Sequence, residues 1–357
     1  MPLIFDGHGD IAIFALAYNR DQTERVVAIN ARETGMTDSY GRACAANSLP
    51  EMRHGRVAVC VSSLAARVRH DCKSTLRTDL DFATHRMAYA SAHGQLAYYR
   101  VLAEENEIRL IRTQEELNDH WARWESLESD QSDLPIGIIV SMECADPIVR
   151  PKQVEQWWKE GLRTVMLTHF GHSQYAAGTG VTGPLTAAGR ELLDEMDQLG
   201  MILDLSHACD ESFFESIERF TGPVIASHNN CRALVPGDRQ LSDSQIKLLL
   251  SRGGVIGSVL DAWMLVPGWI HGKSKPEEVQ LTAVADHINH VCQLAGNSLH
   301  ASIGSDIGGT NHMPSDFRTT ADLQKLDEIL ASRGYSSEDV NNIFHGNWLR
   351  FFQRSLP

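Results

Sequence analysis

Histidine, aspartate and glutamate stand at the ends of several short apolar runs in this sequence. The first run leads into Asp6-Gly7-His8-Gly9-Asp10, in which His8 and Asp10 are two positions apart. In an extended segment such residues point to the same side, so an imidazole and a carboxylate placed this way can bind one cation. Later runs lead in the same way to Glu143, His169, His207, His228 and Asp306. This donor set suits Zn²⁺, and Mn²⁺, Co²⁺ and Fe²⁺ accept the same ligands.

The number of such residues predicts a centre with two metal ions. We expect His8 and Asp10 to bind one cation and His207 and His228 to bind a second, with Glu143 bridging both through its two oxygens. Two divalent ions can hold a shared hydroxide at neutral pH and polarise a carbonyl. Asp306 is then the predicted acid and base, which takes a proton from the bridging water and gives it to a leaving amine. His169 is the predicted substrate contact, because the other ligands already suffice.

These residues require a scaffold that brings many strand ends together. Eight runs rich in β-branched residues are expected strands, namely 3–5, 57–62, 136–141, 164–167, 201–205, 224–226, 255–259 and 301–304. Stretches of helical period lie between most of them or follow the last, namely 81–103, 114–126, 152–159, 187–199, 210–219, 244–251, 276–294, 320–333 and 337–352. Near-continuous apolar strands alternating with helices imply a parallel sheet buried on both faces. We therefore expect an embellished (β/α)8 TIM-like barrel as one domain over residues 1–357, with its active site at the C-terminal ends of the strands.

The charge and composition exclude several classes of function. The chain of 357 residues has a formal net charge of −14, so phosphate backbones and anionic lipids would repel it. No apolar run approaches the roughly 20 residues that span a bilayer. The first residues, 1–10, lack the basic region and the small-residue cleavage site of a signal peptide. The seven cysteines form no C-x-x-C pair. These features favour a cytoplasmic protein with reduced thiols that binds neither nucleic acid nor membranes.

One glycine motif points to a different chemistry and is set aside. Residues 178–183 read G-x-G-x-x-G, which in dinucleotide-binding proteins follows a strand directly and opens a helix. Here a polar stretch precedes the motif and Pro184 follows it. We expect these glycines to shape a loop after a strand instead of binding a nucleotide.

Taken together, these residues resemble the membrane dipeptidase (renal dipeptidase) family of binuclear zinc peptidases, within the amidohydrolase-like barrels. The matching stretches run in order along nearly the whole chain, and the most specific are Asp-Leu-Ser-His at 204–207 and Ser-His-Asn-Asn at 227–230. The others are Phe5–Asp10, Leu49–Arg53, Leu167–His169, Leu185–Glu191, Asp238–Asp243, Ile303–Asp306 and Gly346–Arg350.

The resemblance assigns the same ligands and adds one residue. It implies that His8 and Asp10 bind one zinc ion, that His207 and His228 bind the other, and that Glu143 bridges them, with Asp306 as acid and base. It also implies that His169 lies near the scissile carbonyl or the tetrahedral oxyanion, and that Arg239 binds the C-terminal carboxylate of a dipeptide. A D-residue at that position and a homodimer are further implications of the resemblance.

Two loops depart from the family's pattern, which leaves the substrate open. Phe170–Tyr175 replaces an Asn-rich loop, and Leu260–Met264 replaces an Asn-Phe-Tyr type segment. The leading hypothesis is a zinc dipeptidase. The same dimetal hydrolase could instead act on an N-acyl amino acid, a lactam, a carbamate or another amide. A binding protein without activity would be expected to have lost ligands, whereas all of them are present.

Overall fold

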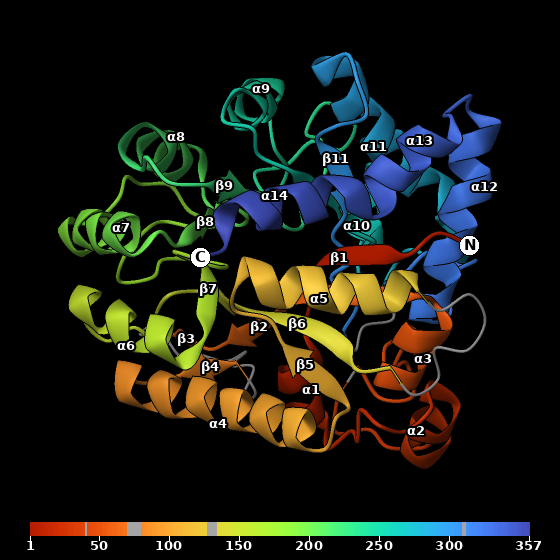
Figure 1. Ribbon diagram of the computed structural model, residues 1–357, viewed down its shortest axis with the longest axis horizontal. Helices are drawn as coiled ribbons and strands as arrows, with labels where there is room; N and C mark the ends of the chain where they lie inside the picture. Colours follow the sequence, from red (N-terminus) through yellow and green to blue (C-terminus); the bar gives the residue numbers. More distant parts are fainter. Residues whose placement is uncertain (40, 70–79, 127–133, 309–311) are drawn as a thin grey trace.

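Eight parallel strands form the centre of the protein in the computed structural model, which describes residues 1–39, 41–69, 80–126, 134–308 and 312–357 (Figure 1). The strands are β1 (Ile4–Gly9), β2 (Val57–Ala65), β6 (Ile136–Glu143), β7 (Leu162–Met166), β8 (Ile202–Asp204), β9 (Val224–Ile225), β10 (Ile256–Ser258) and β11 (Ala301–Ile303). Every residue of these strands is buried. Burial of both faces explains why the strands appear in the sequence as apolar runs without strict alternation.

The strands pair in chain order and close into a barrel. A continuous ladder runs β1-β2-β6-β7-β8-β9, and β10 pairs with β11. Two single bridges join these parts, because Ala226 pairs with Ile256 and Gly9 pairs with Ile307. The predicted (β/α)8 barrel is therefore confirmed.

Helices surround the strands, as Figure 1 shows. They are α1 (Ile11–Tyr18), α2 (Val26–Glu33), α3 (Leu49–His54), α4 (His85–Glu104), α5 (Gln114–Glu125), α6 (Val154–Glu160), α7 (Ala187–Leu199), α8 (Asp210–Arg219), α9 (Asp243–Ser251), α10 (Ala262–Leu265), α11 (Thr282–Ala295), α12 (Lys325–Ser332), α13 (Ser337–Asn341) and α14 (Asn347–Ser355). Short helical turns precede α6, α11, α12 and α14, at 151–153, 276–278, 320–324 and 342–346.

Local capping residues begin two of these helices, and aromatic side chains pack two of them on the barrel. Thr113 and Ser242 form capping boxes at the starts of α5 and α9, which satisfy backbone N–H groups that have no partner inside the helix. Helices α5 and α14 lie side by side in Figure 1, and Phe5 of β1 stacks on Trp121 and Phe352 of these helices. The barrel is therefore anchored to its helical layer by aromatic contacts.

The insertions after β1 and β2 differ from the expected helices. Three further strands occur, β3 (Arg67–Val68), β4 (Asp81–Phe82) and β5 (Ile108–Leu110). Asp81 was expected to begin a helix, but it pairs with Arg67 in the short parallel ladder β3–β4. The expected helix 276–294 is interrupted between residues 278 and 282, where Leu281 N–H donates to the carboxylate of Asp316.

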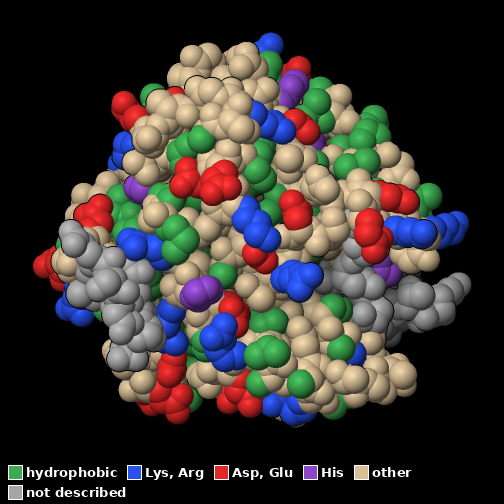
Figure 2. All heavy atoms as spheres, turned by 90° about the vertical axis from the view of Figure 1, so that its right-hand side faces the viewer, with side chains coloured by type: hydrophobic (Ala, Val, Ile, Leu, Met, Phe, Trp, Pro, Cys, Tyr) green, Lys and Arg blue, Asp and Glu red, His purple; other side chains and the backbone are tan. Residues whose placement is uncertain are grey.

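The surface mixes charges of both signs, as the face in Figure 2 shows. Within the described ranges, no helix is both long enough and apolar enough to span a bilayer. Among the residues that the structure describes, Cys60, Cys144, Cys209, Cys231 and Cys292 are free thiols, and Cys72 lies outside the described residues.

Candidate active site

All eight residues predicted for the site meet at the C-terminal ends of the strands. His8 lies one residue before the C-terminal end of β1, and Glu143 is the last residue of β6. The others lie in the segments that follow, so the barrel brings together positions up to 298 residues apart in sequence. Three non-glycine residues at these strand ends have a left-handed backbone: Cys144 (φ 75°), His207 (φ 65°) and Asp306 (φ 54°). Such strained positions persist where the surrounding structure holds them, and they are common at functional sites.

One group of side chains that could hold a cation surrounds the end of β1. Donor atoms of His8, Asp10 and Glu143 all lie within 4.8 Å of one another. His8 Nε2 is 3.6 Å from Asp10 Oδ1 and 3.9 Å from Glu143 Oε2. Ser63 of the neighbouring strand β2 donates a hydrogen bond to Asp10 and so fixes its carboxylate.

A second group shares Glu143 and lies towards β8 and β9. Donor atoms of Glu143, His207 and His228 also lie within 4.8 Å of one another. Glu143 Oε1 is 3.2 Å from His207 Nε2 and 3.5 Å from His228 Nε2, whereas its other oxygen faces His8. The two oxygens of one carboxylate thus face two separate groups of ligands.

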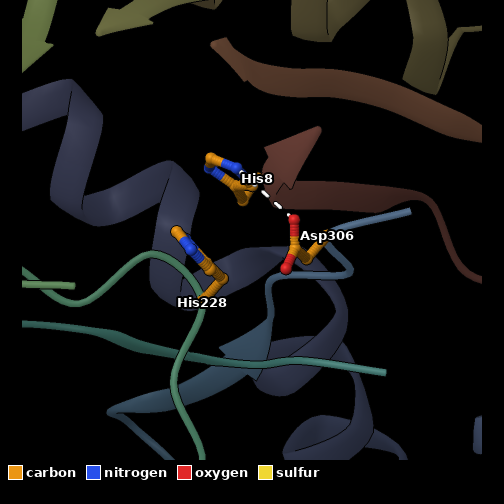
Figure 3. A group of neighbouring side chains, drawn as sticks. All are labelled: His8, His228 and Asp306. Carbon is orange, nitrogen blue, oxygen red and sulfur yellow. Dashed lines mark ion pairs between the residues drawn. The ribbon is translucent and has the colours of Figure 1, made fainter. Parts of the chain in front are cut away.

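Asp306 completes a third group between the other two. Figure 3 shows His8, His228 and Asp306 pointing toward one another from three different segments. Asp306 Oδ1 is 3.7 Å from His8 Nε2. Burial raises the pKa of Asp306 well above its usual range, and the nearby charges of Asp10 and Glu143 act in the same direction.

The histidine rings are oriented by hydroxyl groups behind them. Nδ1 of His228 lies 2.8 Å from Ser227 Oγ, and Nδ1 of His207 lies 3.2 Å from Thr179 Oγ1. These contacts leave Nε2 of each ring directed at Glu143. Metal-binding histidines are typically held in this way through their second nitrogen.

The pKa of His8 and the unpartnered nitrogens of its ring are what a cation-binding site would show. Burial disfavours a charged imidazole at His8, yet the carboxylates of Asp10, Glu143 and Asp306 outweigh this effect and raise the pKa of His8 to about 10. Among the described residues, neither ring nitrogen of His8 has a hydrogen-bond partner. A buried polar atom without a partner is costly. A divalent cation would satisfy Nε2 and replace the proton that the carboxylates attract.

Buried aspartates hold the strand ends together beneath these groups. Asp6 accepts backbone N–H bonds from His8 (3.3 Å) and Ser305 (2.8 Å), which ties the Asp306 turn to β1. Asp204 accepts N–H bonds from Ser206 (3.0 Å) and Ser227 (3.1 Å), which ties the His207 and His228 segments together. Neither aspartate was singled out from the sequence, although both stand two or three positions before a predicted ligand.

His169 is held by a residue that sequence reasoning missed. Nη1 of Arg67 lies 2.6 Å from His169 Nδ1, and Asp81 pairs with the same guanidinium. A guanidinium has only N–H donors, so Nδ1 accepts and the proton of the neutral ring lies on Nε2. That nitrogen is 3.3 Å from Glu143 Oε1. Burial lowers the pKa of His169, and the charges of Arg67 and Arg239 lower it further.

Arg239 is buried and faces the same space. Its Nη2 donates to the carbonyl of His228 over 2.9 Å, while its Nη1 has no partner among the described residues. Burial lowers its pKa, and carboxylates that include Asp306 and Glu143 oppose this effect. The predicted carboxylate-binding arginine therefore lies beside the histidine and carboxylate groups with a donor available.

A cavity of about 520 Å³ opens over these groups. Its lining includes Asp10, Glu143, His169, His207, Arg239 and Asp306. The two loops that depart from the family's pattern contribute Phe170, Asp261, Trp263 and Met264 to its walls. The glycine motif lies in the loop between β7 and α7, as expected. It packs closely against His169, since a Cβ on Gly178 would lie 2.0 Å from the His169 carbonyl oxygen.

Comparison with known proteins identifies the family. The sequence model of the membrane dipeptidase family (Peptidase family M19) matches residues 2–355. An uncharacterized protein in the pqqA 5′ region of Klebsiella pneumoniae is 31% identical over 208 residues, which cover 56% of this chain and 74% of that protein. Dipeptidase verJ of Clonostachys rogersoniana is 26% identical over 357 residues, which cover 98% of this chain and 83% of that protein. Alignments with several other curated dipeptidases cover only 35% to 44% of those proteins.

A solved structure has the same fold. The metallo peptidase of Rhodobacter sphaeroides, liganded with a phosphinate mimic of the dipeptide L-Ala-D-Ala, superimposes with a TM-score of 0.79 at 20% identity, over 99% of both chains. The sequence match extends from one end of the chain to the other, and it agrees with the barrel and its histidine and carboxylate groups. The chain therefore belongs to the membrane dipeptidase family, Peptidase family M19, and is a metal-dependent hydrolase of that family.

Proposed function

We propose that this protein is a dipeptidase that uses two divalent cations, with zinc as the expected metal, to hydrolyse the amide bond of dipeptides. The observation that carries the proposal is the position of Glu143, whose Oε1 faces His207 and His228 while Oε2 faces His8. A carboxylate between two groups of ligands is the arrangement that a binuclear centre requires.

The residues present fit such a centre. His8 and Asp10 would hold one cation, His207 and His228 the other, and Glu143 both. When bound, the cations would supply Lewis-acid polarisation of the scissile carbonyl and a water of lowered pKa. Mn²⁺, Co²⁺ or Fe²⁺ could replace zinc, because imidazole and carboxylate ligands serve all of them.

Asp306 is the proposed proton carrier. Its carboxylate lines the cavity, and its Oδ1 is close to His8 at 3.7 Å. Burial raises the pKa of Asp306, which makes its ionised carboxylate a stronger base. The carboxylate can therefore take a proton from the attacking water, and the acid that forms can pass this proton to the leaving amine. General acid and base catalysis by one positioned carboxyl group contributes typically about 10²–10⁴-fold.

His169 and Arg239 are the proposed substrate contacts. With its proton on Nε2, His169 can donate a hydrogen bond to the oxygen that becomes negative during attack on the carbonyl. Arg239 can donate from its unpartnered Nη1 to the C-terminal carboxylate of a dipeptide. A longer peptide would place a neutral amide at this position, so Arg239 favours short substrates.

The relatives support the substrate class and the tolerance of D-residues. Several curated relatives are named dipeptidases, and the Rhodobacter sphaeroides enzyme was solved with a mimic of L-Ala-D-Ala. We extend both features to this chain, as a dipeptidase that accepts an L- or a D-residue at the C-terminal position.

The experiment is hydrolysis of a panel of L-Xaa-L-Xaa and L-Xaa-D-Xaa dipeptides by the zinc-loaded protein. The Asp306→Asn variant serves as the blank. Turnover that is lost in the variant would support the proposal. If no dipeptide is hydrolysed by protein shown to contain metal, the dipeptidase proposal fails and another amide becomes the substrate to seek.

Three further expectations belong to this proposal. The whole chain, residues 1–357, is proposed to act as one domain. The cytoplasmic location and the homodimer stay predictions, to be checked by fractionation of cells and by the mass of the protein in solution.

A further inference from the structure

Three titratable side chains line the cavity without a part in the proposed reaction. They are Asp261, His271 and His312. Asp261 Oδ1 is 3.4 Å from His312 Nδ1, and the rings of His271 and His312 are 3.8 Å apart between centroids. The side chain of Asp261 keeps 19% of its surface exposed. A ligand in the cavity can therefore reach this carboxylate.

The segment that carries Asp261 is held against the segment that carries Arg239. Asn230 and Gln240, the residue after Arg239, both donate to the Met264 carbonyl, over 3.1 Å and 2.7 Å. The N–H of Ala262, the residue after Asp261, donates to the His312 carbonyl over 2.7 Å. The negative charge of Asp261 is also felt at Arg239. Because Arg239 and Asp261 line the same cavity, a molecule whose carboxylate pairs with Arg239 lies in the space that Asp261 faces.

Among the described residues, the carboxylate of Asp261 is in direct contact with a histidine and with no lysine or arginine. Within the described ranges, no lysine or arginine nitrogen lies within 4.0 Å of its carboxylate, and the ion-pair partner is His312. The adjoining cavity wall is apolar and aromatic, formed by Trp263, Met264, Trp269 and Ile270. An aliphatic stem packs well on such a wall, and a cationic head is attracted both by aromatic faces and by a carboxylate.

We propose that this wall is a specificity site for a cationic side chain, of the lysine or arginine type, on the C-terminal residue of the dipeptide. Asp261 pairs with the ammonium or guanidinium group, while Trp263 and Met264 contact its stem. The inference rests on the proposed dipeptidase activity, because it takes the position of the substrate from Arg239.

The experiment compares L-Ala-L-Lys, L-Ala-L-norleucine and L-Ala-L-Glu as substrates of the zinc-loaded protein. The three side chains are similar in length but carry a positive charge, no charge and a negative charge. We expect kcat/KM for the lysine dipeptide to exceed that for the norleucine dipeptide by about tenfold, as for a partly buried ion pair. The glutamate dipeptide should be the poorest substrate.

Two variants test the role of Asp261. Asp261→Asn keeps the shape of the side chain and loses no capping hydrogen bond, because the Asp261 side chain makes none to α10. In this variant the preference for lysine over norleucine should fall to about threefold or less, mainly through KM. Asp261→Lys should reverse the order, with the glutamate dipeptide above the lysine dipeptide. Asp119→Asn, at an aspartate that is 61% exposed on α5, is the matched control and should keep the wild-type order.

The outcomes separate this inference from the proposed function. Hydrolysis of all three dipeptides without preference for lysine, or a preference that survives in Asp261→Asn, would overturn the inference and leave the dipeptidase proposal intact. Failure to hydrolyse any dipeptide while metal is bound would overturn the proposed function, and the inference with it.

Discussion

The guanidinium of Arg67 lies 2.6 Å from Nδ1 of His169 and is itself paired with Asp81. Arg67 and Asp81 belong to β3 and β4, the short strands of the insertion after β2. Because Arg67 only donates, it fixes which nitrogen of His169 carries the proton. The insertion thus sets the hydrogen-bonding direction of a ring that faces the cavity.

Arg67→Met is expected to lower kcat for dipeptides by about 10–100-fold, the usual effect of losing a partner behind an active-site histidine. Zinc content should be retained, because Arg67 contacts none of the proposed ligands. The ¹⁵N spectrum of the His169 ring should show the proton on Nε2 in the wild type and a mixture of tautomers in the variant. Arg67→Gln, which keeps an N–H donor, should recover part of kcat, and Arg100→Met on the surface should have no effect. An Arg67→Met protein with wild-type kcat would refute this role.

Glu143→Gln is expected to reduce the metal content from two ions per chain to one or none. The amide nitrogen of glutamine cannot act as a ligand, and the negative charge that faces both groups of histidines is lost. Metal analysis after dialysis measures the change. Glu155→Gln, at an exposed glutamate paired with Lys159, is the matched control. Retention of both ions by Glu143→Gln would argue against a bridging carboxylate.

Arg239→Met is expected to lower kcat/KM for dipeptides by at least about tenfold, because a buried charge pair with the substrate carboxylate is lost. The loss should appear mainly in KM. Dipeptides with an amidated C-terminus should be poor substrates of the wild type and should be affected little further by the variant. Equal turnover of free and amidated dipeptides by the wild type would contradict the role of Arg239.

The stability of the fold should depend on pH through His120. This ring is buried on α5, and Nε2 donates to the Ala58 carbonyl of β2 over 2.8 Å. Burial lowers its pKa to about 4, against 6.5 in an unfolded chain. The neutral His120 ring therefore contributes its full stabilisation of the fold above pH 6.5. As the pH falls from 6.5 towards 4, the free energy of unfolding decreases by up to about 3 kcal/mol.

Denaturant unfolding of wild type and His120→Gln between pH 7 and pH 4.5 measures this effect. The difference in unfolding free energy between the two proteins should shrink as the pH falls, because only the wild type must release a proton from His120 on folding. His54→Gln, at an exposed histidine, is the control. A difference that does not change with pH would show that His120 does not titrate in this range.

The strands and the ligands could be predicted because both leave local patterns. All eight barrel strands are apolar runs in the sequence, since they are buried on both faces. The ligands follow these runs directly, so the parallel barrel brings them to one end. His8 and Glu143 lie within β1 and β6 instead of after them. Both are still at the C-terminal end of the barrel, where the site was expected.

The residues that support the ligands could not be found in this way. Arg67 meets His169 across 102 positions of sequence, and no local pattern records that contact. Asp81 was assigned to a helix because the following residues have helical period, yet its side chain is held by Arg67 and its backbone by β3. His120 lies on α5 and meets the Ala58 carbonyl across 62 positions of sequence, a contact that no local pattern records either.

The most direct test of the account is a titration of the metal-free protein with Zn²⁺ that records both bound zinc and hydrolysis of a dipeptide. We predict that two zinc ions bind per chain and that turnover reaches its maximum only when both are bound, because Glu143 joins two groups of ligands. Binding of a single ion with full turnover, or binding of two ions with no turnover of any dipeptide, would contradict a binuclear dipeptidase centred on Glu143.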